Sequence, residues 1–198
     1  MECDTGYAAE PLSSINVDYH FNWNLVSLPL VVEDALYSNL FPEAIDETLY
    51  SFDLMGYVHV GDGYNLETFL LPGIGYWLRF TSDGSTNISG TLINEQTYSL
   101  YEGWNLISGI SYLLDINAII DPDNLIIPGT IYGFEEGGYA LVETMDPGYG
   151  YWVRSTGDGE ITLSSSAPAG RIKTFQKPED ANTLVLSNIT LYFGRALP

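Results

Sequence analysis

The segment Trp-Asn-Leu-Val-Ser at residues 23–27 decides the fold, because it returns as Trp-Asn-Leu-Ile-Ser at residues 104–108. The segment Pro-Gly-Ile-Gly-Tyr-Trp-Leu-Arg at residues 72–79 likewise returns as Pro-Gly-Tyr-Gly-Tyr-Trp-Val-Arg at residues 147–154, with six of eight positions identical. Order and rough spacing are kept, so a supersecondary unit of about 75–80 residues has been duplicated. A duplicated unit offers two similar surfaces, whereas a catalytic centre usually needs one asymmetric cluster of reactive groups.

Short strands separated by turns fill both copies. Residues 15–29 alternate polar and apolar side chains and predict paired strands. Further strands are predicted at residues 48–52, 56–60, 68–71, 75–80, 88–93, 97–101, 130–134, 139–143, 150–155 and 160–164. Short helical turns are expected within residues 31–45 and 116–121. The predicted fold class is all-β: two homologous antiparallel β units, sandwich- or barrel-like, related by internal pseudo-symmetry.

The same pattern divides the chain into four parts. We expect a leader or linker at residues 1–14, a first β repeat at 15–92, a second at 93–166, and a linker with C-terminal strands at 167–198. The run Ser-Ser-Ser-Ala-Pro-Ala-Gly at residues 164–170 marks the start of that last linker. Residues 183–193 alternate well enough to form a strand or hairpin that docks on the repeats.

Composition excludes several classes of partner. The 198 residues carry 26 acidic and 6 basic side chains, for a formal net charge of −20. Nucleic-acid binding needs Lys and Arg to displace counterions from phosphates, so a nucleic-acid partner is not expected. No apolar run approaches the roughly 18–20 residues needed to cross a bilayer, so membrane insertion is not expected either. Neutral partners, cations and basic proteins remain; alternatively, the acid only keeps an aromatic-rich surface soluble.

The N-terminus carries few clues to compartment. Cys3 is the single cysteine, which excludes an internal disulfide and a multi-cysteine metal site. Met1 is followed at once by Glu2, Cys3 and Asp4, without the basic stretch of a signal peptide. Either the protein is cytosolic or the sequence is a mature or excised piece of a longer secreted chain, and we favour the second.

The repeated tryptophans and arginines have a structural interpretation. Trp77 and Trp152 are expected to be core residues, each burying on the order of 200 Å², and they are also reserve candidates for ligand binding. Trp23 and Trp104 are expected in the core as well. The repeated arginines, Arg79 and Arg154, either pair with a carboxylate of their own repeat or stack on an aromatic ring.

Tyrosine carries the main functional signal. There are 15 tyrosines, more than a core of this size needs, because each buried hydroxyl requires a partner. Four of them lie in or beside glycine-rich turns, which are usually exposed: Tyr57, Tyr64, Tyr139 and Tyr149. Exposed rings beside Asp and Asn suit neutral sugars, because a ring stacks on a pyranose while carboxylates and amides accept hydroxyl hydrogen bonds. The alternative is that these tyrosines only cover turn backbone.

Signals for metal binding and catalysis are weaker. Asp121, Asp123 and Asn124 have a plausible local spacing for one structural Ca²⁺, although no complete EF-hand loop is present and such residues also form turns. No other cofactor is expected. The two histidines lack a catalytic motif, and no Gly-x-Ser-x-Gly, His-Glu-x-x-His, Walker or dinucleotide-binding pattern exists. The sequence therefore predicts no enzyme, with a glycosidase built on a carboxylate pair as a remote third hypothesis.

The repeated motifs resemble a module of large secreted, multidomain bacterial surface proteins, in which the module often precedes a sorting domain of the type IX secretion system. Residues 184–194, Leu-Val-Leu-Ser-Asn-Ile-Thr-Leu-Tyr-Phe-Gly, resemble the segment that leads into such a domain. The resemblance covers roughly residues 17–164 plus the tail, and it implies secretion or display on a bacterial cell surface beside neighbouring domains of a longer chain. The family carries no settled activity to transfer.

Two functional hypotheses follow. The first is a non-catalytic extracellular carbohydrate-binding module that binds neutral polysaccharide through exposed aromatic rings. The second is a structural spacer or adhesion domain without a small ligand. Solvent exposure separates them, because a row of exposed rings supports sugar binding and buried rings support a spacer.

Overall fold

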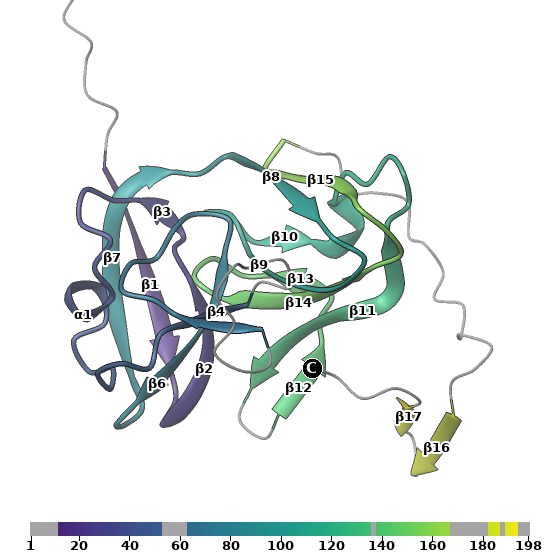
Figure 1. The fold of residues 1–198 in the computed structure, drawn as a ribbon, viewed down its shortest axis with the longest axis horizontal. Coiled ribbons are helices and arrows are strands. Elements are labelled where there is room, and N and C mark those ends of the chain that lie inside the picture. The colour runs from purple at the N-terminus through teal and green to yellow at the C-terminus, as the bar shows by residue number, and fades with distance from the viewer. Residues whose placement is uncertain (1–11, 53–62, 136–137, 167–181, 187–188, 194–198) are drawn as a thin grey trace, which may run out of the picture.

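The protein folds mostly as β-strands in the computed structural model, which describes residues 12–52, 63–135, 138–166, 182–186 and 189–193 (Figure 1). The first repeat contains β1 (Ser13–Tyr19), β2 (Asn22–Ser27), β3 (Leu30–Val31), α1 (Tyr37–Leu40), β4 (Tyr50–Phe52), β5 (Tyr64–Leu66), β6 (Gly75–Phe80) and β7 (Gly84–Leu92). The second contains β8 (Glu95–Leu100), β9 (Gly103–Ser108), β10 (Leu114–Asp115), the 3₁₀ turn η1 (Ile116–Ala118), β11 (Ile126–Glu135), β12 (Gly138–Leu141), β13 (Thr144–Met145), β14 (Gly150–Ser155) and β15 (Gly159–Ser164). The predicted all-β class with short helical turns is confirmed.

The two repeats pair their strands in the same order. The first builds a four-stranded antiparallel sheet β2-β6-β4-β5, and the second builds β9-β14-β11-β12. The registers also correspond, since Leu25 lies opposite Trp77 and Leu106 lies opposite Trp152. Each repeat adds a second antiparallel pair, β1 with β7 and β8 with β15. A rotation axis that relates the two units stays a prediction.

Three hydrophobic clusters hold these sheets together. The first lies inside the first unit, where Val17 and Ile88 from the β1–β7 pair meet Leu78 from the four-stranded sheet. The second lies inside the second unit, where Ile161 of β15 meets Val153 of β14. The third contains residues of both repeats and centres on the fully buried Trp152. Each sheet is therefore covered on one face by its own unit and on the other by its partner.

Two sequence-based predictions about strands are wrong, one about pairing and one about whether a strand forms. Residues 15–29 do form two strands, but β1 pairs with β7 while β2 pairs with β6, so the neighbours in sequence belong to different sheets. The turn between them explains this, because Asn22 has a positive φ of 78° and the chain changes direction there. Residues 68–71 form no regular strand; their backbone instead bonds residues before α1, with the Leu70 amide donating to the Ala35 carbonyl at 3.0 Å. The strand predicted at residues 56–60 lies outside the described residues.

The C-terminal segment forms the predicted hairpin. β16 (Asn182–Leu186) and β17 (Ile189–Phe193) pair only with one another in a two-stranded antiparallel sheet. Figure 1 shows this hairpin apart from the two four-stranded sheets, past the end of β12. Its docking on the repeats stays a prediction, as do the four domain boundaries.

The two Pro-Gly-x-Gly turns join the units along a seam. The Ser27 amide donates to the Gly148 carbonyl at 2.8 Å, and the equivalent Ser108 amide donates to the Gly73 carbonyl at 3.4 Å. Gly73 and Gly148 both have a φ of +90°, which a turn of this kind reserves for glycine. Each turn thus bonds to the last residue of the other repeat's Trp-Asn-Leu strand, and the duplicated motifs hold each other in place.

The second glycine of each turn permits a close approach of backbones. A Cβ added at Gly75 would lie 2.8 Å from the Ile107 carbonyl oxygen, and a Cβ added at Gly150 would lie 3.2 Å from the Gly75 Cα. No side chain fits between strands at these distances. Gly75 and Gly150 are therefore part of the contact between the units.

The repeated arginines stack on the repeated tryptophans. The Arg79 guanidinium carbon lies 5.9 Å from the Trp23 ring centroid, and the Arg154 guanidinium carbon lies 5.9 Å from that of Trp104. Strand register causes this, because Trp23 is opposite Arg79 and Trp104 is opposite Arg154. Of the two roles predicted for these arginines, aromatic stacking is confirmed.

We predict that Gly75→Ala lowers the free energy of unfolding by about 1–3 kcal/mol, because the new methyl group overpacks the seam. Urea denaturation at neutral pH measures this. Gly157→Ala is the matched control, since a Cβ there meets no heavy atom within 4 Å. Equal stability of the two variants would contradict the seam contact.

We also predict that stability falls above about pH 10. Burial raises the pKa of Tyr98 to about 12, an effect that a hydrogen bond with Ser108 partly offsets. The unfolded chain loses this proton near pH 10 while the folded chain keeps it, so rising pH favours unfolding across that window. Tyr98→Phe should remove about 1.4 kcal/mol per pH unit from the slope, measured by urea denaturation between about pH 10 and 11.5. An unchanged slope would contradict the prediction.

Candidate functional site

A cluster of aromatic rings fills the space between the two four-stranded sheets. Two equivalent ring contacts join the units. The centroids of Phe52 and Trp152 are 4.7 Å apart, those of Trp77 and Phe134 are 4.8 Å apart, and both pairs are edge-to-face. Each such pair contributes about 0.5–1.5 kcal/mol beyond its burial. The cluster consists of Leu25, Phe52, Tyr64, Trp77, Trp104, Leu106, Tyr132, Phe134, Tyr139 and Trp152.

Four of the six residues predicted to bind ligand lie in this cluster: Tyr64, Tyr139, Trp77 and Trp152. Trp152 is fully buried and the other three are half-buried. Burial raises the pKa of Tyr139, and the nearby Tyr64 hydroxyl raises it further. These rings therefore belong first to the packing between the units, and they do not form an exposed row.

The remaining two predicted residues lie elsewhere. Tyr149 is half-buried at the seam, where its hydroxyl donates to the Asp18 carbonyl at 3.2 Å. Burial raises the pKa of Tyr149, and the Asp18 carboxylate adds to the effect. Tyr57 lies outside the described residues. The expectation that turn tyrosines are exposed is thus wrong for the three that the structure describes.

One end of the aromatic cluster opens into a cavity of about 450 Å³, which we call the aromatic hollow. The described residues that line it all contribute aromatic rings: Trp23, Tyr50, Tyr64, Trp77 and Phe134. Two of the predicted site residues, Tyr64 and Trp77, are among them. The volume falls within the range of about 300–1,000 Å³ that is typical of small-molecule sites.

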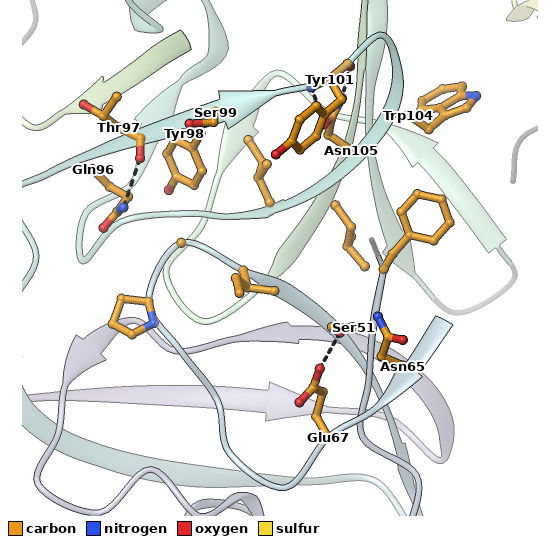
Figure 2. Close-up of a pocket in the computed structure, with 16 residues that line it drawn as sticks. Ser51, Asn65, Glu67, Gln96, Thr97, Tyr98, Ser99, Tyr101, Trp104 and Asn105 are labelled. Carbon is orange, nitrogen blue, oxygen red and sulfur yellow. Dashed lines mark hydrogen bonds between the residues drawn. The ribbon is translucent and has the colours of Figure 1, made fainter. Parts of the chain in front are cut away.

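A second cavity, of about 460 Å³, lies between the repeats, and we call it the first seam cleft (Figure 2). In Figure 2, Ser51, Asn65 and Glu67 lie on one side of it, while Gln96, Tyr98, Ser99 and Tyr101 lie on the other. The first group comes from β4, β5 and the residue that follows β5; the second comes from β8 and the turn after it. The cleft thus combines a carboxylate, three amides and hydroxyls with aromatic rings.

The side chains of the first seam cleft are held by local hydrogen bonds. The Ser51 hydroxyl donates to the Glu67 carboxylate at 2.7 Å, which orients that acid. The Asn105 side chain accepts from the Tyr101 amide at 3.0 Å and donates to the Tyr101 carbonyl at 2.9 Å. The backbone of Tyr101 is therefore held in a turn, and the residue is 40% exposed. An exposed ring on a backbone held in this way suits stacking.

The duplication produces an equivalent second seam cleft with a different lining. Its volume is about 310 Å³, and His20 takes the position of Tyr101 there, while Asp18 takes that of Ser99. Tyr149 stands where the first cleft has Ile74, and it brings a larger side chain to the second cleft. The two clefts share a backbone and differ in size and charge.

Among the candidate Ca²⁺ residues, Asp121 bonds the backbone of its own turn. Both Asp121 carboxylate oxygens accept backbone hydrogen bonds, from the Leu125 amide at 2.8 Å and the Ile126 amide at 3.0 Å. Asp123 and Asn124 are exposed in the same turn. This is the turn-forming role that the sequence left open as the alternative, and the calcium site stays a prediction.

Further catalytic or metal groupings are scarce in the described part of the chain. Among those residues, no group of three or more His, Cys, Asp and Glu side chains could hold a metal ion. His20 lies 3.9 Å from the Asp83 carboxylate on the exposed surface. No helix in the described residues is long and apolar enough to span a membrane.

Sequence reasoning missed the lining of the first seam cleft. Tyr101 ends the predicted strand at residues 97–101, and its exposure depends on a turn that Asn105 closes from four residues away. The signal was present in the repeat itself, because Asn24 closes the equivalent turn by accepting from the His20 amide at 2.9 Å. Comparing the residues at the two equivalent positions, His20 and Tyr101, would have marked the place where the copies diverge.

No family model, curated protein or solved structure matches this chain.

We predict that Asn105→Ala lowers the free energy of unfolding by about 1–3 kcal/mol, because it leaves the backbone groups of the turn without partners. Urea denaturation measures the change. Asn65→Ala, in the same cleft, should stay within about 0.5 kcal/mol of the parent chain. A larger effect of Asn65→Ala than of Asn105→Ala would overturn the role given to Asn105.

Proposed function

We propose that this chain is a non-catalytic carbohydrate-binding module of a larger secreted bacterial protein, and that it binds neutral polysaccharide in the first seam cleft. The observation that carries the proposal is the pairing of the exposed Tyr101 ring with the polar wall of Asn65 and Glu67 across one cavity. The ring supplies an apolar face for a pyranose, and the amide and carboxylate bond its hydroxyls. Secretion or cell-surface display rests on the resemblance of the repeated motifs.

The charge of the chain supports a neutral ligand. A net charge of −20 repels acidic polymers, whereas an uncharged polysaccharide meets no such barrier. The binding residues differ from those that the sequence indicated, because the turn tyrosines Tyr64, Tyr139 and Tyr149 are half-buried. Tyr101 takes over the stacking role in the proposal.

A second candidate is a structural spacer or adhesion domain. The observation that favours it is that the repeated residues make matching bonds in both units. The Tyr76 hydroxyl accepts from the Leu71 amide at 3.0 Å, and the Tyr151 hydroxyl accepts from the Asp146 amide at 2.6 Å. Asp83 and Asp158 likewise accept from backbone amides at 2.6 and 2.9 Å. The duplicated motif thus serves folding, and a spacer needs nothing more.

Retention on insoluble cellulose, xylan and chitin tests the proposal. We expect the intact chain to be retained on at least one of them and Tyr101→Ala to weaken retention by about tenfold, since one stacked ring contributes about 1.4 kcal/mol. Tyr112→Ala is the matched control, because Tyr112 is 37% exposed and lies outside the cleft lining. Failure of the intact chain to bind any member of a broad polysaccharide panel would remove the proposal and leave the spacer.

A further inference from the structure

The aromatic hollow has a different lining from the polar seam clefts. The described residues that line it are five aromatic side chains, and none of the five carries a charge. The rings come from β2, β4, β5 and β6 of the first unit and from β11 of the second. The cavity therefore exists only where the two units meet.

Neighbouring rings of the hollow are steeply inclined to one another. Trp23 and Trp77 are inclined at 87° with centroids 6.4 Å apart, and Trp77 and Phe134 are inclined at 79°. Tyr50 is tilted by 53° against Trp23. A pyranose needs a flat platform for its apolar face, whereas a compact, roughly spherical group fits a corner between perpendicular rings. The geometry disfavours sugar here.

The electrostatics favour a cation. The face of an aromatic ring carries negative charge density, so rings that surround a group from several sides attract a cation. The whole chain, at a net charge of −20, also concentrates cations at its surface. Because the cavity wall is apolar, a cation that is weakly hydrated loses the least on entering it. A quaternary ammonium group meets both conditions.

We propose that the aromatic hollow binds a quaternary ammonium group. The Arg79 guanidinium over Trp23, 5.9 Å from its centroid, shows that this ring already accepts a cation. Arg79 is not part of the cavity lining. It and Arg154 are the only Lys or Arg side chains in the described residues, so Arg79 is the one fixed charge beside the hollow that opposes a bound cation.

Titration with choline and with tetramethylammonium, monitored by tryptophan fluorescence and by calorimetry, tests the proposal. We expect saturable binding in the millimolar range, as a few cation–π contacts allow. The neutral isostere 3,3-dimethyl-1-butanol has the same shape without the charge and should bind at least about tenfold more weakly. Equal binding of both compounds, or no saturable binding of the cations, would overturn the proposal.

Variants locate the site. Tyr50→Leu should weaken choline binding at least about threefold by removing one ring from the wall. Tyr132→Leu is the matched control: Tyr132 tilts against Trp104 at 5.9 Å and 56°, as Tyr50 does against Trp23 at 6.0 Å, but it lies outside the hollow. An equal loss in both variants would contradict the assignment.

Arg79→Gln provides a test that spares the rings. Removing this charge should raise choline affinity about twofold at low salt and leave the neutral isostere unaffected. An unchanged or lower affinity for choline would count against the proposal even if Tyr50→Leu does not fold. Sedimentation with phosphatidylcholine vesicles is the last measurement. If the chain binds choline but does not sediment with the vesicles, the ligand of the hollow is a free solute. If the chain sediments with the vesicles and choline competes this away, the ligand is a lipid headgroup.

Discussion

The structure depends on two glycine-containing turns, each of which is hydrogen-bonded to the other repeat. Each Pro-Gly-x-Gly turn accepts a hydrogen bond from the serine that ends the other repeat's Trp-Asn-Leu strand, at Ser27 and at Ser108. Gly75 and Gly150 let the backbones approach at this point. Since the bonds run in both directions, neither unit can shift along the seam without breaking contacts of both motifs. The aromatic cluster, the hollow and the clefts all lie along the boundary that these turns define.

The repeated and the unrepeated residues have different roles. Repeated side chains close turns, stack on arginine or pack between the sheets, and they do so alike in both units. Unrepeated side chains distinguish the two seam clefts, as the exchange of His20 for Tyr101 and of Ile74 for Tyr149 illustrates, whereas repeated rings supply most of the described lining of the aromatic hollow. Duplication therefore accounts for the shared scaffold, and divergence at a few positions makes the two seam clefts different from one another.

The sequence predicted local structure better than pairing. Residues 75–80 and 150–155 were expected as strands and are strands, because a Pro-Gly turn and clear alternation act within a few residues. The partners of β1 and β2 were not predictable in this way, since strand pairing joins residues between 48 and 77 positions apart. The prediction that single tyrosine rings are exposed was wrong for the same reason. Tyr64 and Tyr139 lie beside turns, yet the other unit covers them, and no local pattern reports that contact.

The substitution of Ile74 by Tyr149 has a consequence for valency. A duplicated scaffold starts with two equal binding places, and a polymer could bridge or crosslink such molecules. Tyr149 lines the smaller cleft and bonds Asp18, so the two clefts are unequal in volume. Under the proposed function a single larger cleft makes the module monovalent, and a polymer strand held there would leave by one dissociation event rather than by two coupled ones.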